Sequence, residues 1–520
     1  MDLGNIKKFE KATQFGVKDI RKIGIVLVFM FIASLIAVIF SDVTNNILLI
    51  VSVVIGMYMA MNIGANDVAN NVGPAVGSKT MTMFMAIIIA VIFEAGGAII
   101  AGGDVVDTIR SGIVSQSAFS DTKIFIAVML AALISSALWL NLATFVGAPV
   151  STTHSVVGGL IGSSIAAGGF GVVHWGVLLG IASSWIISPA IGGAIAALFL
   201  IIIKRTITYK QDKPQAAKKV VPILIFVMSW SFILYLLQKG LSKIISLHII
   251  TQIIIALVLS IAIFVITKPL IAQKADLLNN TKDSIGELFT FPLIFAAALL
   301  SFAHGANDVA NAIGPLAAIN QAISGVVMES KSAVPIWIMV LGGFGISIGL
   351  ALYGPKLIRT VGNEITELDK IRAFCIALSA SITVLIASAL GLPVSSTHIA
   401  IGAIFGIGFL REHLKSNYKK MEQEIIQAHK GRDAQVVQKF LDDFKKATIE
   451  RKQQIIKELK TKSLPFSKKD KKVLKKSVQD ELVKRGAIKK IVAAWLITVP
   501  VSAIVSGVSF FIIVQFADSF

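Results

Sequence analysis

Long apolar runs recur along the whole chain and are separated by short polar segments. A membrane-spanning helix needs about 20 mostly apolar residues, and about a dozen runs approach or exceed that length. Clear examples are Gly24–Phe40, Val220–Leu237, Ile253–Ile266, Val334–Leu352 and Ile491–Phe516. The alternation of apolar and polar residues that is typical of a membrane β-barrel is absent from the sequence. The pattern therefore predicts an all-α polytopic membrane protein.

Two polar stretches interrupt this pattern. Lys204–Lys219 is short and basic, whereas Arg411–Lys490 is long, rich in lysine and contains helix-like sequence such as Met421–Ile449. Basic residues that flank membrane helices stay on the cytoplasmic side, so we expect both stretches in the cytoplasm. A partner-binding or regulatory role for the longer stretch stays open.

Two different motifs each occur twice, in the same order. The sequence Gly-Ala-Asn-Asp-Val-Ala-Asn begins at Gly64 and again at Gly305. The sequence Pro-Val-Ser-(Thr/Ser)-Thr-His begins at Pro149 and again at Pro393, at nearly the same separation from the first motif. Two related halves are the simplest explanation of such a repeat.

Transporters are often built from halves that are inverted relative to each other, with a binding site between them at breaks in the helices. We therefore predict two inverted repeats with broken or re-entrant helices and about 12 transmembrane segments. The expected domains are an amphipathic N-terminal lead-in (1–22), the first transmembrane repeat half (23–203), a basic loop and connecting span (204–250), the second transmembrane repeat half (251–410), the basic helical cytoplasmic loop (411–490) and a final transmembrane helix (491–520).

The repeated Asn-Asp motif carries ligands for a cation. Residues four apart share one face of a helix, so Asn66 and Asn70 project together beside Asp67. Amide and carboxylate oxygens are the ligands that a dehydrated hard cation needs, and such groups are costly inside a membrane unless the protein uses them. The alternative is polar contact between helices. The candidate sodium ligands are Asn66, Asp67, Asn70, Asn307, Asp308 and Asn311.

The repeated Ser/Thr motif suits an oxyanion such as phosphate. Proline favours the first turn of a helix and serine its cap, so each motif predicts a helix that begins inside the membrane with its N–H groups exposed. Neither motif contains Lys or Arg, and a neutral site releases its anion more easily. Ordinary capped helices are the alternative. The candidate phosphate ligands are Ser151, Thr152, Thr153, Ser395, Ser396 and Thr397, together with the amides of Asn70 and Asn311.

Three further residues are candidates for coupling or gating. Glu94 lies in an apolar run, and an acid inside a membrane is a functional candidate. His154 and His398 end the two Ser/Thr motifs and could carry a proton or form structural hydrogen bonds. His304 precedes the second Asn-Asp motif but not the first, and we assign it less weight.

Composition supports the same class of protein. Of 520 residues, 55% are hydrophobic and 15% are charged, and the mean hydropathy is +0.80, whereas soluble proteins carry about 25% charged residues. The net charge of +19 lies mostly in loops, without the aromatic or glycine-rich patterns of nucleic-acid binding, so the lipid bilayer is the expected partner and nucleic acid is not. The sequence contains no Walker loop, dinucleotide fingerprint or catalytic base with an orienting partner, so we predict no cofactor and no enzymatic activity.

The paired motifs resemble the signatures of the inorganic phosphate transporter (PiT) family, sodium/phosphate symporter type. The similarity covers nearly all of the membrane portion, including Gly342–Val361. It implies secondary transport of orthophosphate with sodium or protons, through inverted repeats, re-entrant hairpins and a site assembled from both halves. By match, the residues of the Asn-Asp motifs would bind ions or phosphate, and Thr152, Thr153, Ser396 and Thr397 would bind phosphate.

We therefore predict a sodium-coupled symporter of inorganic phosphate that works by alternating access in the cytoplasmic membrane. Sodium is favoured because asparagine offers cation ligands that do not titrate. A proton-coupled phosphate or metal-phosphate symporter and a sulfate permease are alternatives within the family. An anion channel is the alternative from another class, although a channel favours continuous polar stripes over discrete half-helix motifs. A homodimer is a further expectation.

Overall fold

The computed structural model describes residues 3–41, 47–146, 150–243, 245–325, 334–364, 368–414, 438, 440–443 and 485–517. These ranges contain helices and connecting turns and no β-strand. The basic helical loop predicted at 411–490 lies largely outside the described residues. Both the function of that loop and the domain boundaries remain predictions.

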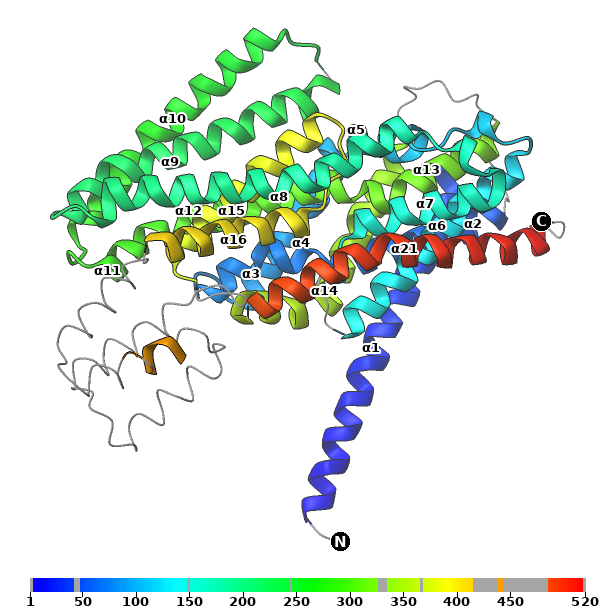
Figure 1. Cartoon of the computed structure of the whole chain (residues 1–520), viewed down its shortest axis with the longest axis horizontal. Coiled ribbons are helices and arrows are strands. Elements are labelled where there is room, and N and C mark those ends of the chain that lie inside the picture. Colours follow the sequence, from blue (N-terminus) through cyan, green and yellow to red (C-terminus); the bar gives the residue numbers. More distant parts are fainter. Residues whose placement is uncertain are drawn as a thin grey trace.

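Long helices account for most of the described chain (Figure 1). In chain order they are α1 (Leu3–Phe40), α2 (Ile47–Asn66), α3 (Val68–Gly77), α4 (Met83–Ala101), α5 (Gly103–Asp107), α6 (Thr122–Val146), α7 (Thr152–Gly168), α8 (Trp175–Ile203), α9 (Lys213–Tyr235), α10 (Ile249–Asp276), α11 (Lys282–Gly286), α12 (Thr290–Asp308), α13 (Ala310–Ser324), α14 (Ile336–Glu364), α15 (Lys370–Ala389), α16 (Ser396–Leu414) and α21 (Arg485–Ala517).

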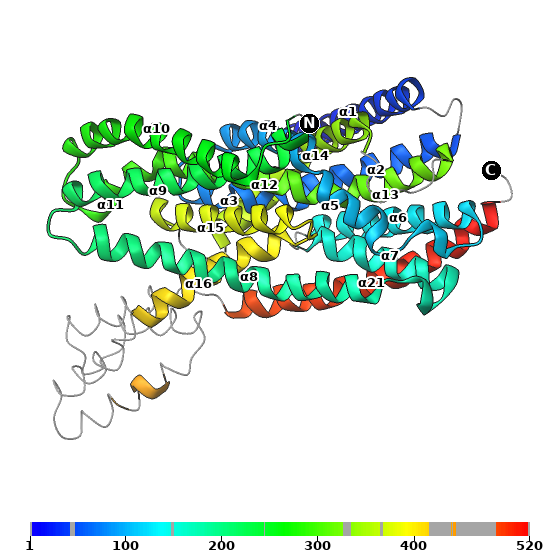
Figure 2. The ribbon, with the colours of Figure 1, turned by 90° about the horizontal axis from the view of Figure 1, so that it is seen from above.

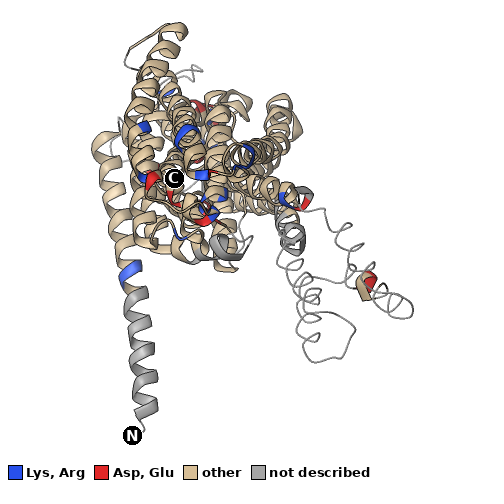
Figure 3. Cartoon of the chain, turned by 90° about the vertical axis from the view of Figure 1, so that its left-hand side faces the viewer, with Lys and Arg blue, Asp and Glu red and all other residues tan. Residues whose placement is uncertain are grey.

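Eleven helical segments in the described part of the chain are long and apolar enough to cross a membrane. Their outer faces carry large apolar side chains such as Ile254, Val258 and Leu496, which are 54%, 58% and 73% exposed. Figure 3 shows how sparse charged residues are along the helical body. Apolar side chains face outward in this way when lipid is the solvent, so the predicted all-α polytopic membrane fold is confirmed.

The two Asn-Asp motifs lie on broken helices that run in opposite directions. In Figures 1 and 2, α2 and α3 lead from right to left across the molecule, whereas α12 and α13 lead from left to right. Asp67 lies between α2 and α3, and Asp308 is the last residue of α12, two positions before α13 begins. Each acid is therefore placed at an interruption of the helix, as expected for inverted repeats.

The two Ser/Thr motifs begin α7 and α16, which fold back against α6 and α15. The hairpin of α6 and α7 lies on the right in Figure 1, and the hairpin of α15 and α16 lies on the left. Neither α7 nor α16 is among the segments long and apolar enough to cross a membrane, as expected of the second helix of a re-entrant hairpin.

A glycine in each Asn-Asp motif allows two helices to approach closely. A Cβ atom on Gly64 would lie 1.8 Å from the carbonyl oxygen of Ile346 in α14. A Cβ atom on Gly305 would lie 2.1 Å from the carbonyl oxygen of Glu94 in α4. Small residues at such crossings let backbones touch without a side chain between them, so α14 and α4 pack directly against the motif-bearing helices.

Candidate functional site

The tips of the two hairpins are capped in the same way. Ser151 Oγ accepts a hydrogen bond of 3.2 Å from the backbone N–H of His154, and Ser395 Oγ accepts one of 3.2 Å from the backbone N–H of His398. Each serine thus satisfies one N–H group of the first turn, and the positive end of each helix dipole remains inside the protein. The predicted half-helices are present at both motifs.

The two tips also touch each other. Thr153 Oγ1 donates a hydrogen bond of 2.9 Å to the carbonyl oxygen of Val394 in the other half. The rings of His154 and His398 have centroids 4.4 Å apart, and the ring of Trp185 lies 3.8 Å from that of His154. Both histidines named as coupling candidates therefore lie at the contact between the halves.

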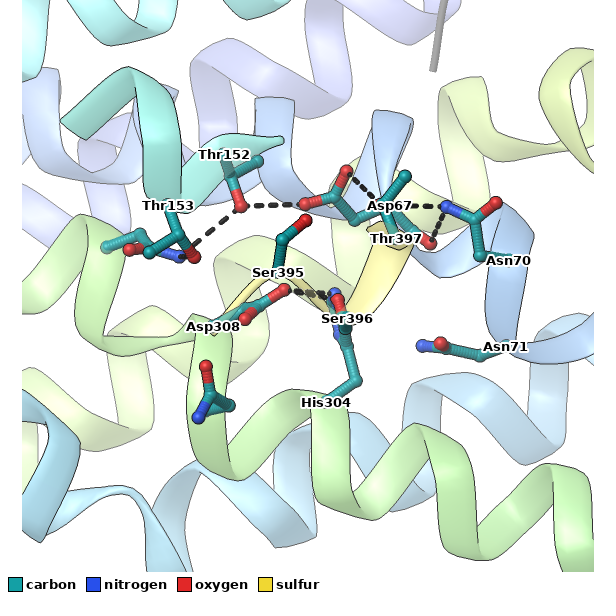
Figure 4. Close-up of polar contacts among 12 residues, drawn as sticks. Asp67, Asn70, Asn71, Thr152, Thr153, His304, Asp308, Ser395, Ser396 and Thr397 are labelled. Atoms are coloured by element: carbon teal, nitrogen blue, oxygen red, sulfur yellow. Dashed lines mark hydrogen bonds and ion pairs between the residues drawn. The ribbon is translucent and has the colours of Figure 1, made fainter. Parts of the chain in front are cut away.

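Asp67 is bonded to both hairpins at once (Figure 4). Its Oδ2 accepts a hydrogen bond of 2.7 Å from Thr152 Oγ1, and its Oδ1 accepts one of 3.1 Å from Thr397 Oγ1. All three side chains are buried. The side chain of Asp67 therefore connects the tips of both hairpins in the interior of the protein.

The second asparagine of each Asn-Asp motif reaches across to the hairpin of the other half. Asn70 Nδ2 donates to Thr397 Oγ1 at 2.9 Å. Asn311 Nδ2 donates to Thr152 Oγ1 at 3.3 Å and to Thr153 Oγ1 at 3.1 Å. The carbonyl oxygens of both amides are buried and accept no hydrogen bond from the described residues, so they are available as cation ligands.

The first asparagine of each motif holds the tip of a hairpin of its own half. Asn66 Nδ2 donates to Thr144 Oγ1 at 3.0 Å, and its Oδ1 accepts from the backbone N–H of Val150 at 3.4 Å. Asn307 Oδ1 accepts from the backbone N–H of Val394 at 3.2 Å. These amides position the Ser/Thr motifs, and their assignment as sodium ligands stays a prediction.

Asp308 belongs to a buried polar chain that extends away from the hairpin tips. Ser396 Oγ donates to Asp308 Oδ2 at 2.7 Å, and His304 Nε2 lies 2.8 Å from the same oxygen. His304 Nδ1 lies 2.6 Å from Glu94 Oε2, and Asn71 Nδ2 donates to Glu94 Oε1 at 2.8 Å. All five residues are buried, and His304 lies between Glu94 and Asp308.

Comparison with known proteins identifies the family. Residues 63–506 match the model of the Phosphate transporter family, which is most of the chain. The chain belongs to this family. A protein of Helicobacter pylori and one of Haemophilus influenzae, both named "Putative phosphate permease", are 53% and 37% identical to it. The alignments cover 98% of both chains in the first case, and 62% of this chain and 78% of the relative in the second.

A solved structure, "The sodium-dependent phosphate transporter", is similar over 90% of this chain and 100% of its own length. Its TM-score is 0.73 and its sequence identity is 29%. The resemblance stated from the motifs is thus confirmed, as are the transporter class and the multi-pass membrane location. The protein is a phosphate transporter and not an enzyme.

The two halves of this transporter differ around their acids. The position four residues before Asp67 is Ile63, whereas the same position before Asp308 is His304. The residue after Asn70 is Asn71, whereas the residue after Asn311 is Ala312. Within the described residues, the series of polar side chains from Asp308 through His304 to Glu94 has no counterpart in the other half of the transporter.

Three side chains of the transporter meet in the geometry of a cation site. Asp67, His304 and Asp308 each offer one ligand atom, and these atoms lie within 4.8 Å of one another. The amide oxygens of Asn70 and Asn311 add further oxygen ligands of the kind that hard cations prefer. The hydroxyls and the helix N-termini beside them are donors suited to an oxyanion.

Most of the predicted site residues of the transporter are brought together. One junction brings together the Ser/Thr motifs, Asp67, Asp308, Asn70 and Asn311. Glu94 lies outside this junction and is linked to Asp308 through His304. His304 was given less weight and Asn71 was not considered. The sequence feature that could have indicated both His304 and Asn71 was Glu94. An acid in an apolar helix needs polar partners on the helices packed against it.

Proposed function

We propose that this protein carries inorganic phosphate by sodium-coupled symport, through a site between its two halves. The observation that carries the proposal is the position of Asp67, which accepts hydrogen bonds from Thr152 of one hairpin and Thr397 of the other. A ligand bound at this carboxylate contacts both halves, so its binding and release are linked to their relative movement.

The proposed sodium ligands are the carboxylates of Asp67 and Asp308 with the amide oxygens of Asn70 and Asn311. Support comes from the burial of these oxygens, from the unpaired amide oxygens, and from the solved relative that is named sodium-dependent. Asparagine oxygens bind sodium at any pH, so a site rich in them favours a metal ion over a proton.

The proposed phosphate ligands are the hydroxyls of Thr152, Thr153, Ser396 and Thr397, with the N-termini of α7 and α16. Three of these hydroxyls donate to the two buried carboxylates. An anion that approached two ionised carboxylates in a medium of low dielectric constant would be repelled. Sodium that binds first removes this repulsion and frees the hydroxyls to turn to phosphate, which couples the two ions.

Alternating access would require the contacts between the hairpin tips to rearrange. Thr153 is bonded to the backbone of Val394, and the rings of His154 and His398 meet at the same place. We propose that these contacts change as the site opens to one side and then to the other. We place the protein in the cytoplasmic membrane. By the positive-inside rule, its basic loops then face the cytoplasm.

A proton-coupled phosphate or metal-phosphate symporter is the second candidate, and a specific observation favours it. The chain of Glu94, His304 and Asp308 links two acids through an imidazole, at 2.6 Å and 2.8 Å. Histidine is the side chain whose ordinary pKa places its change of charge between pH 5 and 8, so this histidine could pass a proton between the two acids. Sulfate remains the rival substrate, because its oxygens present the same acceptors to the hydroxyls.

Uptake of labelled phosphate by the full-length protein in liposomes tests the proposal. An inward sodium gradient at fixed pH should drive accumulation, and potassium in place of sodium should not. A proton gradient alone and excess unlabelled sulfate should have little effect. Uptake that follows the proton gradient without sodium would replace the proposal with the second candidate. Uptake of sulfate in preference to phosphate would refute the substrate.

A further inference from the structure

A groove open to the lipid lies far from the hairpin tips, between α2, α6 and α21. Its volume is about 250 Å³, and nearly all of its lining is apolar. Leu48 and Ile55 of α2, Ile134 of α6 and Ile512 of α21 form its walls, with Lys123 at one end. This volume is below the range of about 300–1,000 Å³ that is typical of sites for drug-sized ligands, and it suits a single narrow chain.

The length of the groove corresponds to one leaflet of a bilayer. The α6 residues that line it extend from Lys123 to Ile134. At a rise of about 1.5 Å per residue this is about 16 Å, close to half of the hydrocarbon core of about 30 Å. A helix of another membrane protein would cross the whole core, whereas the acyl chain of a lipid occupies one leaflet.

The charged end of the groove lies where a lipid headgroup would be. Lys123 is the second residue of α6 and is exposed, and among the described residues that line the groove it is the charged one. A lysine places its stem along apolar surface and its ammonium group at the membrane interface. Asp121 faces the same turn and accepts a hydrogen bond of 2.8 Å from the backbone N–H of Lys123. The positive end of the α6 dipole adds to the attraction for an anion.

We propose that this groove binds one acyl chain of a phospholipid with an anionic headgroup, whose phosphate lies beside Lys123. The lipid would fill the space between α21 and the pair formed by α2 and α6. The site shares no residue with the transport site, so lipid binding and transport can be measured separately.

Native mass spectrometry of the full-length protein in a mild detergent tests the proposal. The protein is incubated with phosphatidylglycerol or with phosphatidylcholine, and the retained lipid is counted. Wild type should retain one copy with a preference of about fivefold for phosphatidylglycerol, which corresponds to about 1 kcal/mol for one lysine at a membrane surface.

Two variants address the two ends of the site. Lys123→Gln should remove the preference for phosphatidylglycerol. Val51→Trp should abolish retention of either lipid, because Val51 lines the groove, is 38% exposed, and a tryptophan there would fill the space. The matched controls are Lys79→Gln, at an exposed lysine, and Leu138→Trp, at a lipid-facing position of α6 outside the groove. Both controls should behave as wild type.

Two outcomes would overturn the proposal. The first is unchanged retention and headgroup preference in Lys123→Gln and Val51→Trp. The second is a wild-type dimer that Val51→Trp converts to monomers without loss of lipid, since the groove would then be an interface between copies of the chain. Lys123→Gln changes an exposed side chain, so the test stands even if Val51→Trp fails to fold.

Discussion

Asn70 in the first half of the protein donates a hydrogen bond of 2.9 Å to Thr397 in the second half, 327 residues further along the chain. The same threonine donates to Asp67, so one side chain of the second half is held by two of the first. Asn311 makes the reciprocal contact with Thr152. Each half therefore supplies hydrogen-bond partners to the other, and a single repeat half expressed alone would lack these contacts.

Replacement of Asp67 by asparagine tests its role in coupling. Asp67→Asn keeps the shape of the side chain but removes the charge that is proposed to bind sodium. A hydrogen bond or ion contact to a charged group contributes about 1.5–3 kcal/mol, so sodium-driven phosphate uptake should fall about tenfold to a hundredfold. Asp121→Asn, at an exposed acid, is the control. Wild-type uptake with normal sodium dependence in Asp67→Asn would refute the assignment.

Two substitutions of Thr397 distinguish the contribution of its hydroxyl from that of its methyl group. Thr397→Val removes the donor to Asp67 and keeps the volume, whereas Thr397→Ser keeps the donor. We expect Thr397→Val to lower phosphate uptake at least about tenfold, because a buried carboxylate loses a partner, and Thr397→Ser to retain most of it. Equal activity of the two variants in liposomes would show that the hydroxyl has no part in transport.

Close packing at Gly305 predicts a loss of stability. Gly305→Ala places a methyl carbon 2.1 Å from the carbonyl oxygen of Glu94, and relief of such a clash costs about 1–3 kcal/mol. Thermal unfolding in detergent should show a lower midpoint. Gly176→Ala in α8 is the matched control, because a Cβ there meets nothing within 4 Å. A midpoint for Gly305→Ala equal to that of the control would contradict the packing.

The buried pair of Glu94 and His304 predicts non-additive effects on stability. Glu94→Gln and His304→Gln should each destabilise the protein, because each removes one member of a buried pair of an acid and a histidine. The double variant should be less destabilised than the sum of the two, with an interaction energy of about 0.5–3 kcal/mol. Denaturant unfolding of the four proteins completes the cycle. Additive effects would mean that the two residues act independently.

Asp369, which caps α15 outside the membrane segments, predicts a dependence of stability on pH. Burial raises the pKa of Asp369, but Arg372 and Lys282 more than offset this effect and leave the pKa below its usual value. Because the folded pKa is lowered, the stability that this acid contributes is complete above the unfolded pKa of about 4 and is lost as pH falls through the folded pKa.

The variant Asp369→Asn isolates this charge, because asparagine can still cap the helix. At pH 7 it should be less stable than wild type by at most about 1 kcal/mol, given partial exposure, and the difference should vanish at strongly acidic pH. Thermal unfolding across this range is the measurement. A difference that stays constant down to strongly acidic pH would exclude the two ion pairs as its cause.

The fold, and which candidate residues lie close together, could largely be predicted from the chain. Apolar runs indicated the membrane helices, and the repeated motifs indicated which residues meet, because both signals are local in sequence. The contact of Asn70 with the opposite hairpin could not be predicted, since it depends on how the halves pack. The partnership of His304 with Glu94 was missed for the same reason, because the two lie 210 positions apart on helices joined through a glycine crossing.

The roles of Asn66 and Asn307 show a second limit. An asparagine can bind an ion or accept hydrogen bonds from backbone N–H groups. The spacing of asparagines in the sequence does not distinguish these two roles. In the structure their amide oxygens accept from the backbone N–H groups of Val150 and Val394. Only the positions of neighbouring atoms could have distinguished these uses.

The difference between Ile63 and His304 has a consequence for the resting state of the protein. If the two repeats exchanged shapes to open the site first to one side and then to the other, identical repeats would make the two states mirror images of equal energy. One Asp here has a histidine within bonding distance and the other has isoleucine at that position. Under that mechanism the two states would differ in energy, and the protein without substrate would favour one side of the membrane.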